Sequence, residues 1–317
     1  MTRILTITMN PSVDVSTTVE RVIPSSKLRC GPARRDPGGG GINVARVAKR
    51  LGADVVALYT AGGEKGQLLR RLIGKEGLEG ISLPISEETR EDFTVDEATS
   101  GQEFRFVSPG PTLNESEWRA TLAMISELRF PFDFVVASGS LPPGVPDDFY
   151  AQIAAIAKAK GAPFALDASG PALRGALRAA VDVLKPSLSE LRDLTGLPLG
   201  GPSACVGACK RLVDQGAAKI VALTLGSQGA IVVSADEVLR AWPLSIHVVS
   251  TVGAGDSFLA AFICALGSGR SLTEAFRRAV AAGTAALIAP GTQLCRVADV
   301  DEFESHVHID RMNPVLV

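Results

Sequence analysis

The stretch PGGGGINVAR (Pro37–Arg46) joins four consecutive glycines to the start of a segment with helical apolar periodicity. A flexible linker would be polar and repetitive, whereas this run leads directly into an amphipathic helix. A dinucleotide-binding fingerprint has the spacing G-x-G-x-x-G directly after a strand, and the preceding GPARRD does not provide that context. The run therefore predicts bare backbone at a helix N-terminus, where a ligand can lie on the main chain and Asn43 can hydrogen-bond a polyol.

Apolar runs typical of buried strands alternate with helix-length segments along most of the chain. The candidate strands cover residues 3–9, 54–60, 133–138, 163–169, 181–187 and 219–226. This alternation predicts an α/β fold with a mostly parallel sheet that helices cover on both faces. In such a sheet, ligands bind beyond the carboxyl ends of the strands.

Two regions depart from this alternation, at residues 13–22 and 92–108. Their polar and apolar side chains alternate with period two, which predicts antiparallel strands with one apolar face. We expect them to form a small β lid over the carboxyl edge of the main sheet, inserted at about residues 12–36 and 88–108. The whole chain, 1–317, is expected to be one domain that ends in two helices, near 255–268 and 271–289.

Composition excludes several classes of function. A net charge of −2 and an aromatic content of 5% do not favour nucleic acid as a partner. No apolar window is long enough for a membrane span, and the N-terminus lacks the apolar core of a signal peptide. The five cysteines include no C-x-x-C pair and are expected to be reduced thiols of a cytoplasmic protein. They are Cys30, Cys205, Cys209, Cys264 and Cys295.

A second motif, STVGAGDSF (Ser250–Phe258), places glycines in a turn before a helix. The amides of Ala254, Gly255 and Asp256 would point out of the helix start and form an anion hole for a transferring phosphoryl group. Asp256 would either face a substrate hydroxyl as a base or cap its helix. The helix start is expected to lower the pKa of Asp256, which phosphoryl transfer tolerates because its transition state is loose.

The two motifs, in this order and at this spacing, resemble the signatures of the ribokinase-like (PfkB-type) carbohydrate kinase family. The likeness follows nearly the whole chain, through KLRC (27–30), RFVSPG (105–110), SGSLPPG (138–144) and GTQLC (291–295). The resemblance implies a three-layer α/β/α core with a small antiparallel β lid, and a homodimer formed through the lid. It also implies ATP with Mg²⁺, and K⁺ for many members.

Within the family, the motifs are most similar to those of the glycolytic kinases that phosphorylate fructose 6-phosphate at C1 to give fructose 1,6-bisphosphate. Tagatose 6-phosphate and fructose 1-phosphate remain open as substrates, because MNPSVD (9–14) is more similar to kinases of those sugars. Those relatives commonly carry a lysine where this chain has Gly40, which favours fructose 6-phosphate. A catalytically silent regulator that binds a sugar phosphate would not need Asp256 beside an anion hole, and an oxidoreductase would need the absent fingerprint.

The resemblance also assigns site residues by position. Asp256 would be the catalytic base, with Gly253, Ala254 and Gly255 as the anion hole. The sugar phosphate would be bound by Asp14, Lys27, Gly39, Asn43, Arg90, Arg105 and Ser140, and the three cations among them would hold its phosphate group. ATP would be bound by Lys185, Ser187, Thr224, Gly226 and Gly229, where Ser187 replaces the usual asparagine. Glu190 and Asp167 would serve Mg²⁺, and the backbone carbonyls of Ser250, Val252, Ala286, Gly291 and Gln293 would hold K⁺.

Overall fold

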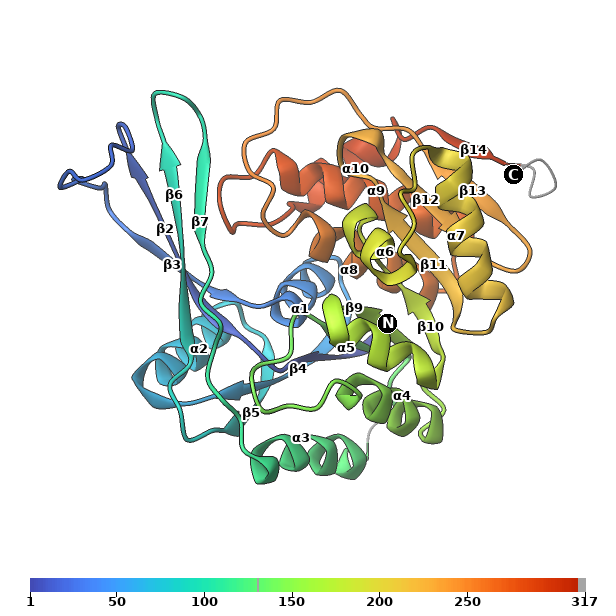
Figure 1. The fold of residues 1–317 in the computed structure, drawn as a ribbon, viewed down its shortest axis with the longest axis horizontal. Coiled ribbons are helices and arrows are strands. Elements are labelled where there is room, and N and C mark those ends of the chain that lie inside the picture. Colours follow the sequence, from blue (N-terminus) through green and yellow to red (C-terminus); the bar gives the residue numbers. More distant parts are fainter. Residues whose placement is uncertain (130, 313–317) are drawn as a thin grey trace.

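A ten-stranded sheet forms the centre of the molecule in the computed structural model, which describes residues 1–129 and 131–312 (Figure 1). Its strand order is β14-β13-β12-β11-β10-β9-β8-β1-β4-β5. The neighbours from β11 to β5 run parallel, and β12, β13 and β14 add antiparallel strands at one edge. The strands are β1 Arg3–Thr8, β4 Asp54–Ala61, β5 Glu79–Pro84, β8 Phe134–Ser138, β9 Phe164–Asp167, β10 Val181–Leu184, β11 Ala218–Thr224, β12 Ala230–Val233, β13 Val238–Ala241 and β14 Ile309–Arg311.

Helices cover both faces of this sheet, which confirms the predicted three-layer α/β/α core. The central strands are buried along almost their whole length, as expected for parallel strands between two helical layers. One apolar cluster packs the sheet against α1 Gly40–Arg50, α2 Gly63–Lys75, α8 Ala254–Gly267, α9 Leu272–Leu287 and α10 Val297–Glu304. The other packs it against α3 Glu115–Glu127, α4 Phe149–Ala159, α5 Gly170–Ala176, α6 Leu188–Thr195 and α7 Pro202–Asp214. Two short 3₁₀ helices, η1 Leu177–Ala179 and η2 Gly226–Gln228, complete the helical elements of the described residues.

A separate four-stranded sheet stands out from one side of the molecule (Figure 1). Its order is β3-β2-β6-β7, with β2 Ser12–Val19, β3 Arg34–Gly38, β6 Arg90–Glu97 and β7 Glu103–Phe106. The outer pairs are antiparallel as predicted, but the central pair, β2 and β6, is parallel. The reason is that β2 and β6 follow β1 and β5, which run in the same direction in the main sheet, so both chains leave it the same way.

The C-terminal part of the chain differs from its prediction in one respect. The two expected helices are confirmed as α8 and α9, but α10 and β14 follow them, and β14 pairs with β13 at the sheet edge. Among the helices of the described residues, none is both long and apolar enough to cross a membrane. All five cysteines are free thiols.

Candidate active site

A cavity of about 180 Å³ has one wall from the four-stranded sheet and another from the starts of α1 and α8. It brings together seven residues predicted for catalysis or sugar binding, namely Asp14, Gly39, Asn43, Arg90, Arg105, Gly253 and Asp256. The cavity is also lined by Val252, a predicted potassium ligand, and by Ser12, Gly40, Asp92, Phe93, Thr94, Val107 and Thr292.

Two residues predicted to bind the sugar phosphate do not line this cavity. Lys27 is exposed in the segment between β2 and β3. Ser140 follows β8, where its Oγ accepts a hydrogen bond from Asn10 Nδ2 at 3.1 Å. The structure therefore places both of them outside the group formed by the other predicted residues.

Asp256 lies in the first turn of α8 but does not cap it. Gly253 is the N-cap, and no side chain makes a capping hydrogen bond there. The Asp256 carboxylate instead accepts hydrogen bonds from Asn43 Nδ2 at 3.0 Å and from Ser138 Oγ at 3.4 Å. Ser138 was not predicted, although a polar side chain that ends a buried strand is a recognisable signal for this edge of the sheet.

The pKa of Asp256 is raised, so the prediction of a lowered value is wrong. Burial is the largest cause and outweighs the opposing effects of the Asn43 hydrogen bond and of the Lys185 and Arg105 charges. The sequence showed the helix start but not the loss of hydration around this carboxylate. A raised pKa makes Asp256 a stronger base than its position on the helix alone would give.

The start of α8 offers free backbone amides to an anion. The first amide with an acceptor inside this helix belongs to Ser257, which donates to the Gly253 carbonyl at 2.8 Å. The preceding amides of Ala254, Gly255 and Asp256 are therefore the unpaired donors of this helix terminus. A Cβ atom at position 255 would lie 3.3 Å from Lys185 Nζ, so the lysine ammonium group approaches the same turn.

Lys185 carries a positive charge in a buried position. Its Nζ forms an ion pair with Asp167 at 3.0 Å, and the side chain is only 5% exposed. Burial lowers the pKa of Lys185, but the carboxylates of Asp167, Glu190 and Asp256 outweigh this and leave it raised. The ammonium group therefore stays protonated next to the free amides of this turn.

The predicted nucleotide residues meet at the carboxyl ends of β10 and β11. The Thr224 amide donates to the Pro186 carbonyl at 3.0 Å, and Ser187 and Thr224 form a β-bridge. Gly226 and Gly229 flank the turn that follows. Ser187 and Glu190 form a capping box for α6, in which each side chain accepts a hydrogen bond from the backbone amide of the other residue.

All four glycines pack closely against other parts of the chain, and Gly39 and Gly40 also line the cavity. A Cβ atom at Gly40 would collide with Ser138 Oγ, and one at Gly39 would lie 2.7 Å from Thr8 Cγ2. Gly39 also has a φ of 106°, which side-chain-bearing residues rarely adopt. The run therefore brings the start of α1 against the ends of β1 and β8, and this contact places Asn43 beside Asp256.

Arg90 and Arg105 line the cavity from the four-stranded sheet, which we call the lid, and their side chains differ in the contacts that they make. Arg90 donates to the carbonyls of Asn10 and Ser108 at 3.0 and 2.9 Å and pairs with Asp92 at 2.8 Å. The exposed side chain of Arg105 makes no hydrogen bond or ion pair with any residue that the structure describes. Arg105 is thus the cavity-lining cation that is available to a ligand.

Asp14 is the second carboxylate of the cavity with a shifted pKa. Burial, the largest cause, raises its pKa to about 6, against the lowering effect of a 2.6 Å hydrogen bond from Ser12 Oγ. The neighbouring Asp92 raises it further, whereas Arg90 and Arg105 lower it. The cavity therefore holds the Asp14 charge at a cost to the stability of the free protein.

Replacing Asp14 with Asn is expected to stabilise the ligand-free protein near pH 8 but not near pH 4. Between the ordinary value of 3.8 and about 6, the folded protein binds a proton that the unfolded chain has released, so stability falls as pH rises through this window. The shift sets an upper limit of about 3 kcal/mol on the gain. Thermal unfolding of both proteins at the two pH values measures it, and an equal gain at both would contradict a charge effect.

The residues predicted to bind metal ions are not brought together as clearly as the residues that line the cavity. Within residues 1–129 and 131–312, no three His, Cys, Asp or Glu side chains form a group that could hold a metal ion. The segment that contains Ser250 and Val252 meets the end of α9, because the Ser250 amide donates to the Leu287 carbonyl at 3.2 Å. The Gln293 carbonyl accepts a hydrogen bond from Arg50 at 2.6 Å, which leaves it less available to a cation.

Both the sequence and the structure of this chain are similar to those of known proteins. The model of the pfkB family carbohydrate kinases matches residues 5–299. The ATP-dependent 6-phosphofructokinase isozyme 2 of Mycobacterium tuberculosis is 43% identical, over 95% of this chain and 88% of the relative. The 1-phosphofructokinase of Rhodobacter capsulatus is 34% identical over 90% of each.

Two solved structures of Escherichia coli phosphofructokinase-2 share the fold over 96% of this chain and 99% of theirs. The complex with fructose-6-phosphate has a TM-score of 0.91 at 36% identity. The complex with potassium has a TM-score of 0.92 at 37% identity.

Proposed function

This chain belongs to the pfkB family of carbohydrate kinases, and we propose that it is an ATP-dependent 6-phosphofructokinase that converts fructose 6-phosphate to fructose 1,6-bisphosphate. The observation that carries the proposal is the pairing of a base and a free cation in one cavity. Asp256 comes from the core wall and Arg105 from the lid wall. A sugar with a hydroxyl at one end and a phosphate at the other satisfies both.

In the proposed reaction, the C1 hydroxyl oxygen bonds to the γ-phosphorus while the bridging P–O bond to ADP breaks, and the hydroxyl proton passes to Asp256. Asn43 and Ser138 hold the carboxylate in position through their hydrogen bonds. The amides of Ala254 and Gly255, with Lys185, stabilise the negative charge on the phosphoryl oxygens. Positioning and charge stabilisation of this kind account for most of the catalysis of phosphoryl transfer.

The nucleotide and its metal ion are proposed to bind at the carboxyl ends of β10 and β11. Thr224, Gly226 and Gly229 would contact the nucleotide, with Ser187 close by through its bridge to Thr224. Mg²⁺ usually needs only one or two protein carboxylates when substrate phosphates supply other ligands. The charges of Asp167 and Glu190 both act on Lys185, so this region provides such a pair. From the resemblance to the family, we also propose that backbone carbonyls of residues 250–252 and 286–293 bind K⁺.

Two observations favour fructose 6-phosphate over the substrates of related kinases. The higher identity is to the 6-phosphofructokinase relative. In addition, no side chain fits at Gly40 without displacing Ser138, so this site has no room for the lysine that those kinases commonly carry by the family resemblance. The test is ADP release with fructose 6-phosphate, fructose 1-phosphate, tagatose 6-phosphate and ribose, with and without K⁺. A clear preference for any sugar other than fructose 6-phosphate would refute the assignment.

The whole chain is proposed to act as one kinase domain whose lid forms a homodimer. Phe93 and Phe106 are paired across β6 and β7 and are 45% and 60% exposed, and the adjacent Val107 is 62% exposed. Exposed apolar side chains that cluster in this way are typical of an interaction surface.

Phe106→Asp is expected to dissociate this dimer, because a charge would be buried in the apolar contact. Sedimentation velocity of the wild type and the variant measures the change. The exposed Trp242, which lies away from the lid at the end of β13, provides the control: Trp242→Asp should leave the sedimentation coefficient unchanged. A wild-type monomer, or a dimer that survives Phe106→Asp, would refute the lid as the interface.

A further inference from the structure

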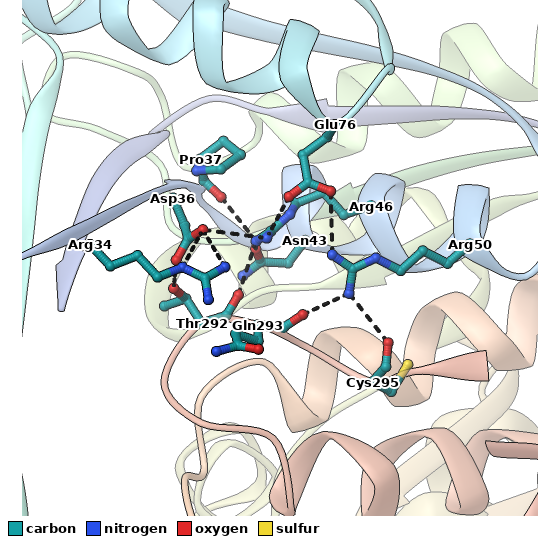
Figure 2. A network of polar contacts seen from close by, with 10 residues as sticks. All are labelled: Arg34, Asp36, Pro37, Asn43, Arg46, Arg50, Glu76, Thr292, Gln293 and Cys295. Carbon is teal, nitrogen blue, oxygen red and sulfur yellow. Dashed lines mark hydrogen bonds and ion pairs between the residues drawn. The ribbon is translucent and has the colours of Figure 1, made fainter. Parts of the chain in front are cut away.

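Arg46 of α1 lies at the centre of a buried network of polar contacts (Figure 2). Its side chain is fully buried, and its Nη2 pairs with Glu76 of the segment after α2 at 2.9 Å. Its Nη1 donates to three oxygens: the carbonyls of Pro37 and Thr292 at 3.3 and 3.2 Å, and Asn43 Oδ1 at 3.4 Å. One guanidinium group thus joins the lid strand β3, helix α1 and the segment after α9.

The contact with Asn43 fixes which end of the Asn43 amide faces the active site. A guanidinium group can only donate hydrogen bonds, so Arg46 requires the amide oxygen on its own side. The amide nitrogen must then point the other way, where it donates to Asp256 Oδ2 at 3.0 Å. Without Arg46 the amide could rotate and present its oxygen to the carboxylate, which is a repulsive arrangement unless Asp256 takes up a proton.

We propose that Arg46 is a positioning residue for phosphoryl transfer, which orients the Asn43 amide so that it donates to the catalytic carboxylate of Asp256. The proposal rests on the role of Asp256 in the proposed function.

A second part of the network ties the lid to the core. Thr292 Oγ1 donates to Asp36 Oδ2 of β3 at 2.6 Å, and the Arg46 guanidinium lies 3.9 Å from the other oxygen of that carboxylate. Arg46 therefore contacts both Asp36 of the lid and Thr292 of the core, next to the cavity.

Arg50, one turn further along α1, provides a matched control. It contacts the same Glu76 carboxylate at 3.3 Å and the carbonyls of Gln293 and Cys295 at 2.6 and 3.3 Å. None of the hydrogen bonds that the structure gives Arg50 reaches Asn43. Replacing Arg46 with Lys therefore disturbs both the network and the contact with the Asn43 amide. Replacing Arg50 with Lys disturbs the same network but not that contact.

Arg46→Lys is expected to lower kcat by about ten- to a hundredfold, because a misplacement of about 1 Å in a catalytic site can cost about a hundredfold in rate. The lysine still neutralises Glu76, so the variant should fold, but its single nitrogen cannot also take the place of Nη1 against Asn43 Oδ1. The acid limb of the pH–kcat profile is expected to move to higher pH, because Asp256 loses a donor that stabilises its charge. Arg50→Lys should leave this limb in place. The other charged groups that act on Asp256, namely Lys185, Arg105 and Asp167, are unchanged in both variants.

A second measurement does not depend on activity. In protein labelled with ¹³C at the aspartate carboxyls, the Asp256 resonance is assigned by its absence in Asp256→Asn. The midpoint of its titration should be higher in Arg46→Lys than in the wild type, and this difference should disappear when both carry Asn43→Ala. An unchanged midpoint in Arg46→Lys, or an equal shift in Arg50→Lys, would overturn the proposal. Failure of the proposed function would instead appear as a wild type with no activity toward fructose 6-phosphate.

Discussion

Replacing Asp256 with Asn is expected to lower kcat by about three orders of magnitude, with sugar and nucleotide affinities changed only a few-fold. The amide has the size of the carboxylate and can still accept a hydrogen bond from Asn43, so the cavity keeps its shape. It cannot take the proton of the attacking hydroxyl. ADP release measures kcat, and isothermal titration with fructose 6-phosphate measures binding.

Asp92→Asn provides a control in the same cavity. Asp92 lines the wall formed by the lid, pairs with Arg90 and accepts a hydrogen bond from the Ser108 amide, but it does not contact Asp256. We expect its removal to change kcat by less than about tenfold, because no proton transfer depends on it. If Asp256→Asn kept most of the activity, or lost no more than Asp92→Asn, another group would have to be the base.

Six of the ten strands of the main sheet could be predicted because they lie between two helical layers. Burial on both faces makes each central strand a continuous apolar run, and six such runs became β1, β4, β8, β9, β10 and β11. The sequence signal is weaker at the sheet edges. Strand β5 is mostly exposed or half-buried, and β14 has only three residues, so neither has a continuous apolar pattern.

The direction of the lid strands could not be predicted from alternation. A period of two tells which face of a strand is apolar, but it does not tell how the strand pairs. The parallel pairing of β2 with β6 follows from the path of the chain out of the main sheet, and that path is a property of the tertiary structure.

The active site, too, could be predicted from the sequence only in part. Most of the site residues assigned inside the two glycine motifs lie together in one cavity. The roles of Arg46, which ends the first motif, and of Ser138 were missed because they depend on segments that lie far away in the sequence. A single arginine in a helix has the local pattern of a solvent-exposed residue, and only the approach of Asp36, Glu76 and Thr292 buries it. The pKa of Asp256 was predicted wrongly for the same reason.

Arg105→Ala is expected to raise KM for fructose 6-phosphate about a hundredfold while changing kcat much less. The Arg105 guanidinium has no hydrogen-bond or ion-pair partner in the described part of the chain, and it lines the cavity, so a phosphate group would gain the full strength of a charge-assisted contact. Loss of such a contact costs several kcal/mol. Steady-state kinetics with fructose 6-phosphate and with fructose, which lacks the phosphate, measure the selectivity of the effect.

The two lid arginines should then behave differently, although their sequence context suggested equal roles. Arg90 holds the lid through Asn10, Ser108 and Asp92, so Arg90→Ala should weaken the use of both sugars and lower the thermal stability. Arg105→Ala should affect the phosphorylated sugar alone, and Arg105→Lys should recover part of the loss because it keeps the charge. Arg35, an exposed lid arginine outside the cavity, controls for a general loss of positive charge. Equal losses for both sugars in Arg105→Ala would remove Arg105 as the phosphate contact.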